Sequence, residues 1–532
     1  MAELLCGDGI AATASGVKRR GHSRRPASAF AVFGIAAIVA GSGDNGAVGS
    51  AAAQRPPNFL LILVDDQAQN TFKPRFMPHT FHDLVDHATS FTNALAAPPL
   101  CCPDRAGILT GQYPHNHGVF SNHPGYAELH DPHNTLPVWL QNAGYRTGLF
   151  GRFVNHYGEV SGAAPAPGFD RWFALLDGRS QYFDYAVSDD GTVRRYGHSD
   201  RAYSTDVLTR KTRHFIRRSG SRSRPFLAWL GYHAPHIEPV PDGRCEGKNP
   251  LPPGRAAYRR FHRARLPRSR AFNERRVADK PGQIRALNRL RKPAIREIER
   301  RWHCALGAMV EVDRQVGRLM KELRRDGELR RTIVIYLSDN GFFFGQHRLR
   351  IGKGFVYEPA LNVPFVMRVP RPYRSSATSR SLDSVVSKQD IAPTLLDYVN
   401  RYGGSADSCA SPGDCRRMDG RTLQPLLGSA GQWRRGRGVL AEIDSRRTAK
   451  SNDPECNCAY HAIRTSRYLY SELVSGEREL YDLRMDPEEL RNKAGSAAYA
   501  EREHSLAARL DLLGQCSGME GRDPPAVVPY CE

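Results

Sequence analysis

Three apolar runs of this sequence end in polar residues that could do chemistry. The runs FLLILV, TIVIYLS and PFLAWLGY lead, in that order, into Asp65 and Asp66, into Asp339 and Asn340, and into His233 and His236. Carboxylate and amide oxygens are hard donors, so the first two pairs suit Ca²⁺ or Mg²⁺ and not zinc or copper. His236 is a candidate for acid–base work, whereas His233 is more typical of a structural histidine.

The elements that would hold these residues are buried strands of a parallel sheet. Near-continuous apolar runs are typical of strands covered by helices on both faces. Ligands bind at the carboxyl ends of such strands, so the three polar groups can share one site. A lone strand-end aspartate is more often a helix cap or turn former, but two strand ends with paired donors favour the site. Apolar residues at helical spacing predict a helix from Ile295 to Leu329 that precedes the second strand.

The length of 532 residues predicts more than one core. We expect an α/β catalytic domain over residues 54–415 and a smaller α+β domain over residues 416–532. In the smaller domain two short strands flank VSGERE as an antiparallel hairpin, and a final helix follows. The stretch 250–301 is rich in Arg and Pro with little periodicity, and we interpret it as a surface insertion.

The formal charge of +21 favours anionic partners such as nucleic acid, anionic lipid or sulfated and phosphorylated substrates. A general preference for arginine would explain the same charge without any such partner. The basic insertion has the same two interpretations: a solvated face, or a face that binds a polyanion.

The first 53 residues are typical of an export signal. Basic residues precede an apolar run from Ala27 to Ala40, and small residues stand before Gln54. The run is short for a membrane span. We therefore expect a secreted or extracytoplasmic protein that begins near Gln54 and has no stable membrane span, although an uncleaved leader would anchor it to the cell surface.

Cysteine usage is consistent with export. Besides one cysteine in the leader and the adjacent pair Cys101 and Cys102, eight remain: Cys245, Cys304, Cys409, Cys415, Cys456, Cys458, Cys516 and Cys531. An even set in an exported chain suggests disulfides. Cys409 and Cys415 are close enough to close a small loop. Zinc binding at Cys456 and Cys458 is the less favoured alternative, because no second pair with ligand spacing accompanies them.

The adjacent cysteines open a motif that resembles a known signature. Cys101-x-Pro103-x-Arg105 followed by AGILTG is similar to the signature of the type I sulfatases, whose cysteine is converted after translation to formylglycine. The resemblance continues through ILVDDQ, GYRTGLFGRFVNHYG, YHAPHIEP, LSDNG, GKGFVYEPALNVPF, DIAPTLLD and ELYDLRMDPEEL. It is greatest to the branch of glucosamine-6-sulfatases and related extracellular sulfatases.

The resemblance implies an alkaline-phosphatase-like α/β fold with a mostly parallel sheet flanked by helices and a smaller C-terminal antiparallel sheet. It implies that a formylglycine-generating enzyme converts Cys101, that Cys102 is a buried spectator, and that one Ca²⁺ is bound. The metal ligands would be Asp65, Asp66, residue 101, Asp339 and Asn340.

The same resemblance assigns roles to the basic residues. Arg105 would hold the formylglycine hydrate, Lys353 would bind sulfate and assist the leaving oxygen, and His236 would protonate that oxygen. One hydroxyl of the hydrate would attack sulfur and the other would expel sulfate by re-forming the aldehyde. A helix N-terminus just after Cys101 would add backbone N–H groups suited to an anion.

Four positions depart from the family pattern. Arg152 replaces a usual lysine and keeps the charge with a different fork geometry. Val154 replaces a histidine, with Asn155 or His156 as possible substitutes; Asn362 replaces an arginine; and Asp104 stands where Ser or Ala is common.

We therefore expect a calcium-dependent sulfuric ester hydrolase acting on a sulfated carbohydrate such as N-acetylglucosamine-6-sulfate or on aryl sulfates, and no nucleic-acid partner. One rival is a phosphodiesterase or phosphonate hydrolase of the same fold, since fold does not fix function. The other is a non-catalytic polyanion-binding protein, in which Cys101 would stay a thiol.

Overall fold

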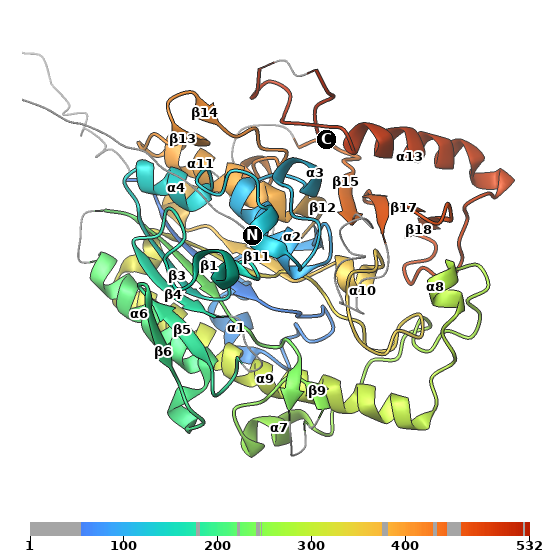
Figure 1. Ribbon diagram of the computed structural model, residues 1–532, viewed down its shortest axis with the longest axis horizontal. Helices are drawn as coiled ribbons and strands as arrows, with labels where there is room; N and C mark the ends of the chain where they lie inside the picture. Colours follow the sequence, from blue (N-terminus) through green and yellow to red (C-terminus); the bar gives the residue numbers. More distant parts are fainter. Residues whose placement is uncertain are drawn as a thin grey trace, which may run out of the picture. The chain divides into compact units, whose positions relative to one another are not determined.

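A mixed sheet forms the centre of the described chain (Figure 1). The computed structural model describes residues 55–176, 181–220, 224–240, 245, 247–374, 381–428, 433–443, 459–524 and 527–532. The ten strands of this sheet, in spatial order, are β12 (Ser381–Ser387), β2 (Thr89–Leu95), β11 (Phe365–Arg368), β10 (Thr332–Ser338), β1 (Asn58–Val64), β7 (Phe226–Gly231), β3 (Arg146–Gly151), β4 (Arg171–Leu175), β5 (Ala186–Asp189) and β6 (Thr192–Arg195).

The five strands from β10 to β4 run parallel, and antiparallel pairings occur only toward the two edges. The three apolar runs that the sequence predicts as strands are β1, β7 and β10. They lie side by side, with β1 in the middle and buried along its whole length. The mostly parallel sheet is therefore confirmed, and the polar residues after these strands meet at one edge.

Alternate residues of β1 enter two different cores. Leu60, Ile62 and Val64 pack in a core with α6 (Ser204–Gly220) and α9 (Lys292–Arg325). The intervening residues of β1 pack in a second core with helices that include α2 (Cys101–Thr110), α4 (Leu136–Asn142) and α11 (Ile391–Arg401). The sheet thus has helices on both faces, as strands apolar on both sides require.

The helix predicted from 295 to 329 is shifted toward the N-terminus. Helix α9 begins at Lys292, with Pro293 in the first turn, where its missing N–H costs no hydrogen bond. It ends at Arg325, and Gly327 follows with φ of 75°. A glycine in this left-handed conformation is a common helix terminator, so residues 328–330 form a separate 3₁₀ turn.

The insertion at 250–301 is only partly a surface segment. Helix α7 (Arg255–Phe261) packs on α9, whose first turns belong to the same stretch, and a short helix α8 (Gly282–Arg285) lies between them in sequence. Leu266, Ile284 and even Lys280 are buried. The lack of periodicity reflects short elements that pack against the rest of the chain.

A second sheet follows in the C-terminal part. Strands β15 (Val439–Ile443), β16 (Tyr460–Arg464), β17 (Tyr468–Leu473) and β18 (Arg478–Asp482) form an antiparallel sheet that packs with α13 (Ala500–Leu513) (Figure 1). The predicted hairpin is the β17–β18 pair, and two further strands extend it. The division at residue 415 stays a prediction.

Three disulfides join six of the eight candidate cysteines: Cys245–Cys304, Cys409–Cys415 and Cys516–Cys531. The predicted small loop is confirmed. Cys456 and Cys458, and the leader over residues 1–53, lie outside the described residues. Within the described part of the chain, no helix has the length and apolar character that a membrane crossing needs.

Candidate active site

The two acid-bearing loops meet because β1 and β10 are parallel neighbours in register. Val64 pairs with Ser338, so the residues that follow both strands leave the sheet together. Asn340 Nδ2 donates to Asp66 Oδ1 at 2.6 Å, and the backbone N–H of Asp66 donates to Asp339 Oδ1 at 3.1 Å. All four oxygen-bearing side chains of these loops are buried.

Cys101 is the first residue of α2 and is fully buried against these acids. Its Sγ lies 3.4 Å from Asp65 Oδ1 and 2.8 Å from Lys353 Nζ. Cys102, beside it, is also buried. The predicted helix start at Cys101 is therefore confirmed, and the motif cysteine points at the strand ends.

Arg105 lies one turn further along α2, so its side chain shares a face with Cys101. One of its terminal nitrogens donates to Asp339 Oδ2 at 2.6 Å and lies 2.9 Å from Asp65 Oδ2. The other donates to the carbonyl of Phe153 at 2.7 Å. Arg105 thereby joins α2 to both acid-bearing loops.

Three further segments complete the cluster. Lys353 Nζ also donates to Asp66 Oδ1. Arg152, just after β3, places Nε 3.1 Å from Asp65 Oδ2, and its terminal nitrogens donate to Gln181 and Asn155. His236, beyond β7, places Nε2 3.7 Å from Asp66 Oδ2 with a quarter of its side chain exposed. All nine predicted site residues therefore lie together, although their roles are not fixed by proximity.

Burial and neighbouring charges shift the ionisation of these groups in opposite directions. Burial would raise the pKa of Asp65, but Arg105, His236 and Arg152 hold that pKa well below its usual value. Burial, reinforced by Asp65, raises the pKa of Asp339 to about 6. Burial also raises the pKa of the Cys101 thiol, so an unmodified Cys101 is protonated at neutral pH.

The residues present fit a hard cation. Asp66 Oδ2 and Asn340 Oδ1 are buried oxygens without a hydrogen-bond donor among the described residues. Atoms of Asp65, Asp66, Cys101 and His236 lie within 4.8 Å of one another. Unpaired buried oxygens are costly unless a cation or donor satisfies them, and oxygen donors of this kind suit Ca²⁺ or Mg²⁺.

The positions that depart from the family pattern have distinct surroundings. Asp104, one turn into α2, forms a buried ion pair with Lys388 at 3.1 Å, and Lys388 also donates to the carbonyl of Asp339. Asn155 supports Arg152, whereas His156 faces Glu159 at the surface and Val154 enters the core. Sequence reasoning missed Lys388 and Gln181, because neither stands in a motif or at a strand end predicted from the sequence.

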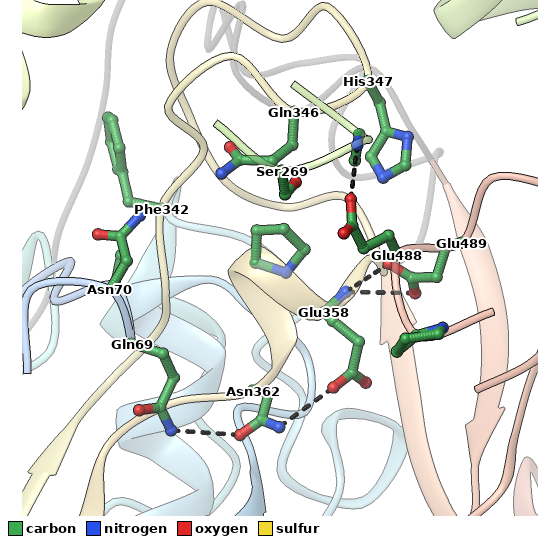
Figure 2. A pocket seen from close by; sticks show the side chains of 14 residues that line it. Gln69, Asn70, Ser269, Phe342, Gln346, His347, Glu358, Asn362, Glu488 and Glu489 are labelled. Atoms are coloured by element: carbon green, nitrogen blue, oxygen red, sulfur yellow. Dashed lines mark hydrogen bonds between the residues drawn. The ribbon is translucent and has the colours of Figure 1, made fainter. Parts of the chain in front are cut away.

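A pocket of about 250 Å³ lies where the two acid-bearing loops continue (Figure 2). Gln69 and Asn70 follow the first loop, and Phe342 follows the second. Asn362 bridges Gln69 and Glu358 across the floor, with hydrogen bonds of 3.4 and 3.1 Å. The lining contains neither Cys101 nor the strand-end acids, so this pocket is a neighbouring feature, and its walls combine polar side chains with alanine, proline and phenylalanine.

Comparison with known proteins identifies the family. Residues 57–401, more than half of the chain, match the family model described as Sulfatase. The chain belongs to the sulfatase family. Residues 345–515 of this sulfatase also match the model described as N-sulphoglucosamine sulphohydrolase, C-terminal. It is 30% identical over 522 residues to N-acetylglucosamine-6-sulfatase of Capra hircus, with 91% of this chain and 88% of the goat protein covered.

Solved structures show the fold of the sulfatase. One neighbour, solved in complex with its substrate D-glucosamine-2-N,6-O-disulfate, has a TM-score of 0.64 at 22% identity and covers 86% of this chain and 97% of its own. The phosphonate monoester hydrolase of Agrobacterium radiobacter has a TM-score of 0.61, also at 22% identity, and covers 85% and 94%. The alkaline-phosphatase-like fold is thus confirmed, and family membership confirms a sulfuric ester hydrolase.

Proposed function

We propose that this sulfatase releases inorganic sulfate from a sulfated carbohydrate, with a 6-sulfated N-acetylglucosamine as the favoured unit and aryl sulfates as artificial substrates. The observation that carries the proposal is the position of Cys101 at the start of α2, within 3.4 Å of Asp65 and 2.8 Å of Lys353. The goat relative, named for the 6-sulfate of N-acetylglucosamine, supports the choice of sugar.

The acid-bearing loops and residue 101 would hold one Ca²⁺. Asp65, Asp66, Asp339 and Asn340 supply its oxygen ligands. Formylglycine at position 101 would supply a hydrated aldehyde as the nucleophile, and Ca²⁺ would supply positive charge beside the sulfate oxygens. The buried oxygens of Asp66 and Asn340 that lack donors support this ligand set.

The basic residues of the cluster would bind and orient the sulfate group. Arg105, Arg152 and Lys353 approach the acids from three different segments, so an anion placed between them meets cations on several sides. Fixed charges in a water-poor site stabilise developing negative charge better than mobile water does. Arg105 is fully buried, and both terminal nitrogens of its guanidinium donate hydrogen bonds.

His236 is suited to protonate the leaving oxygen of the sugar. It is the partly exposed member of the cluster, so it lies on the side from which a substrate enters. Burial lowers the pKa of His236. A bound anion would favour the charged imidazolium, so it would help His236 to take up the proton that it then donates. Lys353 is the second group that can assist this oxygen.

The neighbouring pocket is suited to the body of a sugar. Its amides and carboxylates, including Gln69, Asn362 and Glu358, offer donors and acceptors for hydroxyl and acetamido groups (Figure 2). Such groups fix the orientation of a ligand in a mostly preformed pocket.

Three disulfides support an extracytoplasmic setting, with conversion of Cys101 by a formylglycine-generating enzyme during export.

The test is a substrate panel assayed with protein whose aldehyde at residue 101 is verified by mass spectrometry. The panel contains sulfated monosaccharides, an aryl sulfate, phosphate diesters and phosphonate esters, each with and without Ca²⁺. We expect Ca²⁺-dependent sulfate release that Cys101→Ala abolishes, with a 6-sulfated N-acetylglucosamine preferred. Cleavage of phosphonate or phosphodiester bonds without sulfate release would instead support the rival that shares this fold.

A further inference from the structure

A second pocket, of about 670 Å³, lies at the ends of the strands of the large sheet that are opposite to the candidate active site. Its walls come from the segment before β2, from the turn before β10 and from the segment after β11. The lining residues are Asp86, His87, Ala88, Arg330, Arg368, Val369, Pro370, Arg371, Pro372 and Arg374. Because β2 and β10 start here while β11 ends here, this is the amino-terminal edge of the parallel strands.

The pocket carries a large excess of positive charge. Four arginines line it, against the single carboxylate of Asp86. Among the residues that the structure describes, Arg330, Arg368 and Arg371 form no ion pair with a carboxylate. Elsewhere the arginines of this chain often have acidic partners, as Arg331 has in Glu328 next to this pocket.

Arg368, one of these four arginines, is only partly exposed. Its terminal nitrogen donates to the carbonyl of Leu329 at 3.0 Å. Burial, together with the nearby charges of Arg324 and Arg374, lowers the pKa of Arg368 to about 10. A half-buried guanidinium whose charged neighbours are cations is stabilised when an anion enters, because that anion relieves both the repulsion and the loss of hydration.

The pocket is well separated from the candidate active site. Arg368 pairs with Val334 in the sheet, and Asp339 lies five residues beyond Val334. At about 3.3 Å per residue of strand, the two sites are roughly 17 Å apart. One monosaccharide cannot occupy both sites. A chain of several sugars can contact the arginine pocket while another part of that chain, or a different chain, occupies the candidate active site.

We infer that the arginine pocket formed by Arg330, Arg368, Arg371 and Arg374 binds sulfate and carboxylate groups of an anionic polysaccharide chain, as a docking site separate from the catalytic cluster. The choice of a sulfated glycan rests on the proposed function. Arginine suits this ligand because its planar fork makes bidentate contacts with sulfate-like and carboxylate oxygens.

The test measures binding to immobilised heparin as a function of salt. In Arg330→Ala/Arg371→Ala, both altered residues are exposed, so folding is spared. The matched control, Arg255→Ala/Arg265→Ala, removes the same charge from exposed positions of the basic insertion. We expect the pocket variant to elute at lower salt, with the slope of log affinity against log salt reduced by about 2 and affinity reduced at least tenfold, whereas the control stays near wild type.

The inference would be overturned by equal weakening of heparin binding in both variants, which would indicate net charge alone, or by weakening confined to the insertion variant. The inference would also be overturned, in favour of a membrane surface, if the pocket variant lost binding to phosphatidylserine vesicles while its heparin binding stayed unchanged. Sulfate release from a monosaccharide, measured in parallel, should be unchanged in the pocket variant. If wild-type protein released no sulfate but the heparin result held, the proposed function would fail while the docking site stood.

Discussion

The ammonium group of Lys353 lies 2.8 Å from the sulfur of Cys101 and also donates to Asp66. Lys353 comes from a loop 252 residues further along the chain, yet it is buried like the cysteine, with 2% of its surface exposed. If residue 101 carries the nucleophile, as we propose, a cation held this close to it can act on that nucleophile and on the group that it attacks.

Replacing Lys353 by alanine should therefore reduce turnover strongly. We expect kcat for sulfate release to fall about 10²-fold or more, because both charge stabilisation and proton assistance are lost. Lys321→Ala, at an exposed position of α9, is the matched control and should behave as wild type. A fall in kcat of less than about threefold for Lys353→Ala would contradict the assigned role.

Arg152 offers a graded test of geometry at constant charge. Arg152→Lys keeps the positive charge near Asp65 but removes the hydrogen bonds to Gln181 and Asn155. We expect kcat/KM to fall by about tenfold, and further in Arg152→Ala, since charged hydrogen bonds are worth about 1.5–3 kcal/mol. Asn155→Ala, which removes one of the two bonds, should have a smaller effect than Arg152→Lys.

Conversion of Cys101 should require an unfolded chain. Cys101 and Cys102 have no exposed surface in the folded protein. In folded, unconverted protein we expect neither cysteine to react with iodoacetamide, while both react in guanidinium chloride, as measured on the peptide around residue 101. Incubation of folded protein with a formylglycine-generating enzyme should give no aldehyde, and efficient conversion of folded protein would refute this order of events.

The buried pair of Asp104 and Lys388 should matter for stability as well as for the site. Burial acts against both charges of this pair, raising the pKa of Asp104 and lowering that of Lys388, while the charge of each residue opposes that shift on its partner. Asp104→Ala leaves the ammonium without its partner, and we expect a loss of about 3–5 kcal/mol in the free energy of unfolding, measured by urea denaturation. Replacing both residues, by Asp104→Leu and Lys388→Met, should cost less than the sum of the single variants.

His115 should make stability depend on alkaline pH. It belongs to α3 (Pro114–His117) and donates to Glu442 of β15 at 2.7 Å and to the carbonyl of Cys516 at 2.8 Å. Burial would lower the pKa of His115, but these two acceptors raise that pKa to about 9. Since this pKa lies above the usual 6.5, the stabilisation is complete below pH 6.5 and is lost as the pH rises through 9.

The corresponding measurement is the melting temperature of wild type and His115→Gln between pH 6 and pH 10. The difference in melting temperature between the two proteins should be largest near pH 6 and should shrink toward pH 10. The corresponding difference in the free energy of unfolding has an upper limit on the order of 3 kcal/mol. His504→Gln is the surface control and should show no such trend. A difference that does not change with pH would show that His115 acts by packing alone.

Much of the candidate site could be predicted from the sequence because its residues follow apolar runs. FLLILV and TIVIYLS are buried on both sides, so they had to be central strands, and their register brings Asp65 next to Asp339. What could not be predicted depends on long-range packing. Lys388 resembles any other lysine until α2 and the segment after β12 pack together, and then it lies under Asp104.

The remaining differences also have physical reasons. The antiparallel strand β11 interrupts the parallel order beside β10, and it is too short for periodicity to reveal its direction. The insertion has no repeating apolar pattern, yet it buries Lys280 against Glu274 and packs on α9. Such segments obtain their structure from the rest of the chain, so their own sequence carries little signal.

The pairing of Asn58 with Thr332 joins positions 274 residues apart. Contacts this distant in sequence make folding slow, since a long loop must close before the sheet gains stability. During synthesis, β1 and the segment around Cys101 emerge well before β10 exists. At roughly 5–20 residues per second, the ribosome needs about ten seconds or more to add the missing stretch. Chain order therefore sets a time interval in which the cysteine is accessible, and the arrival of β10 ends it.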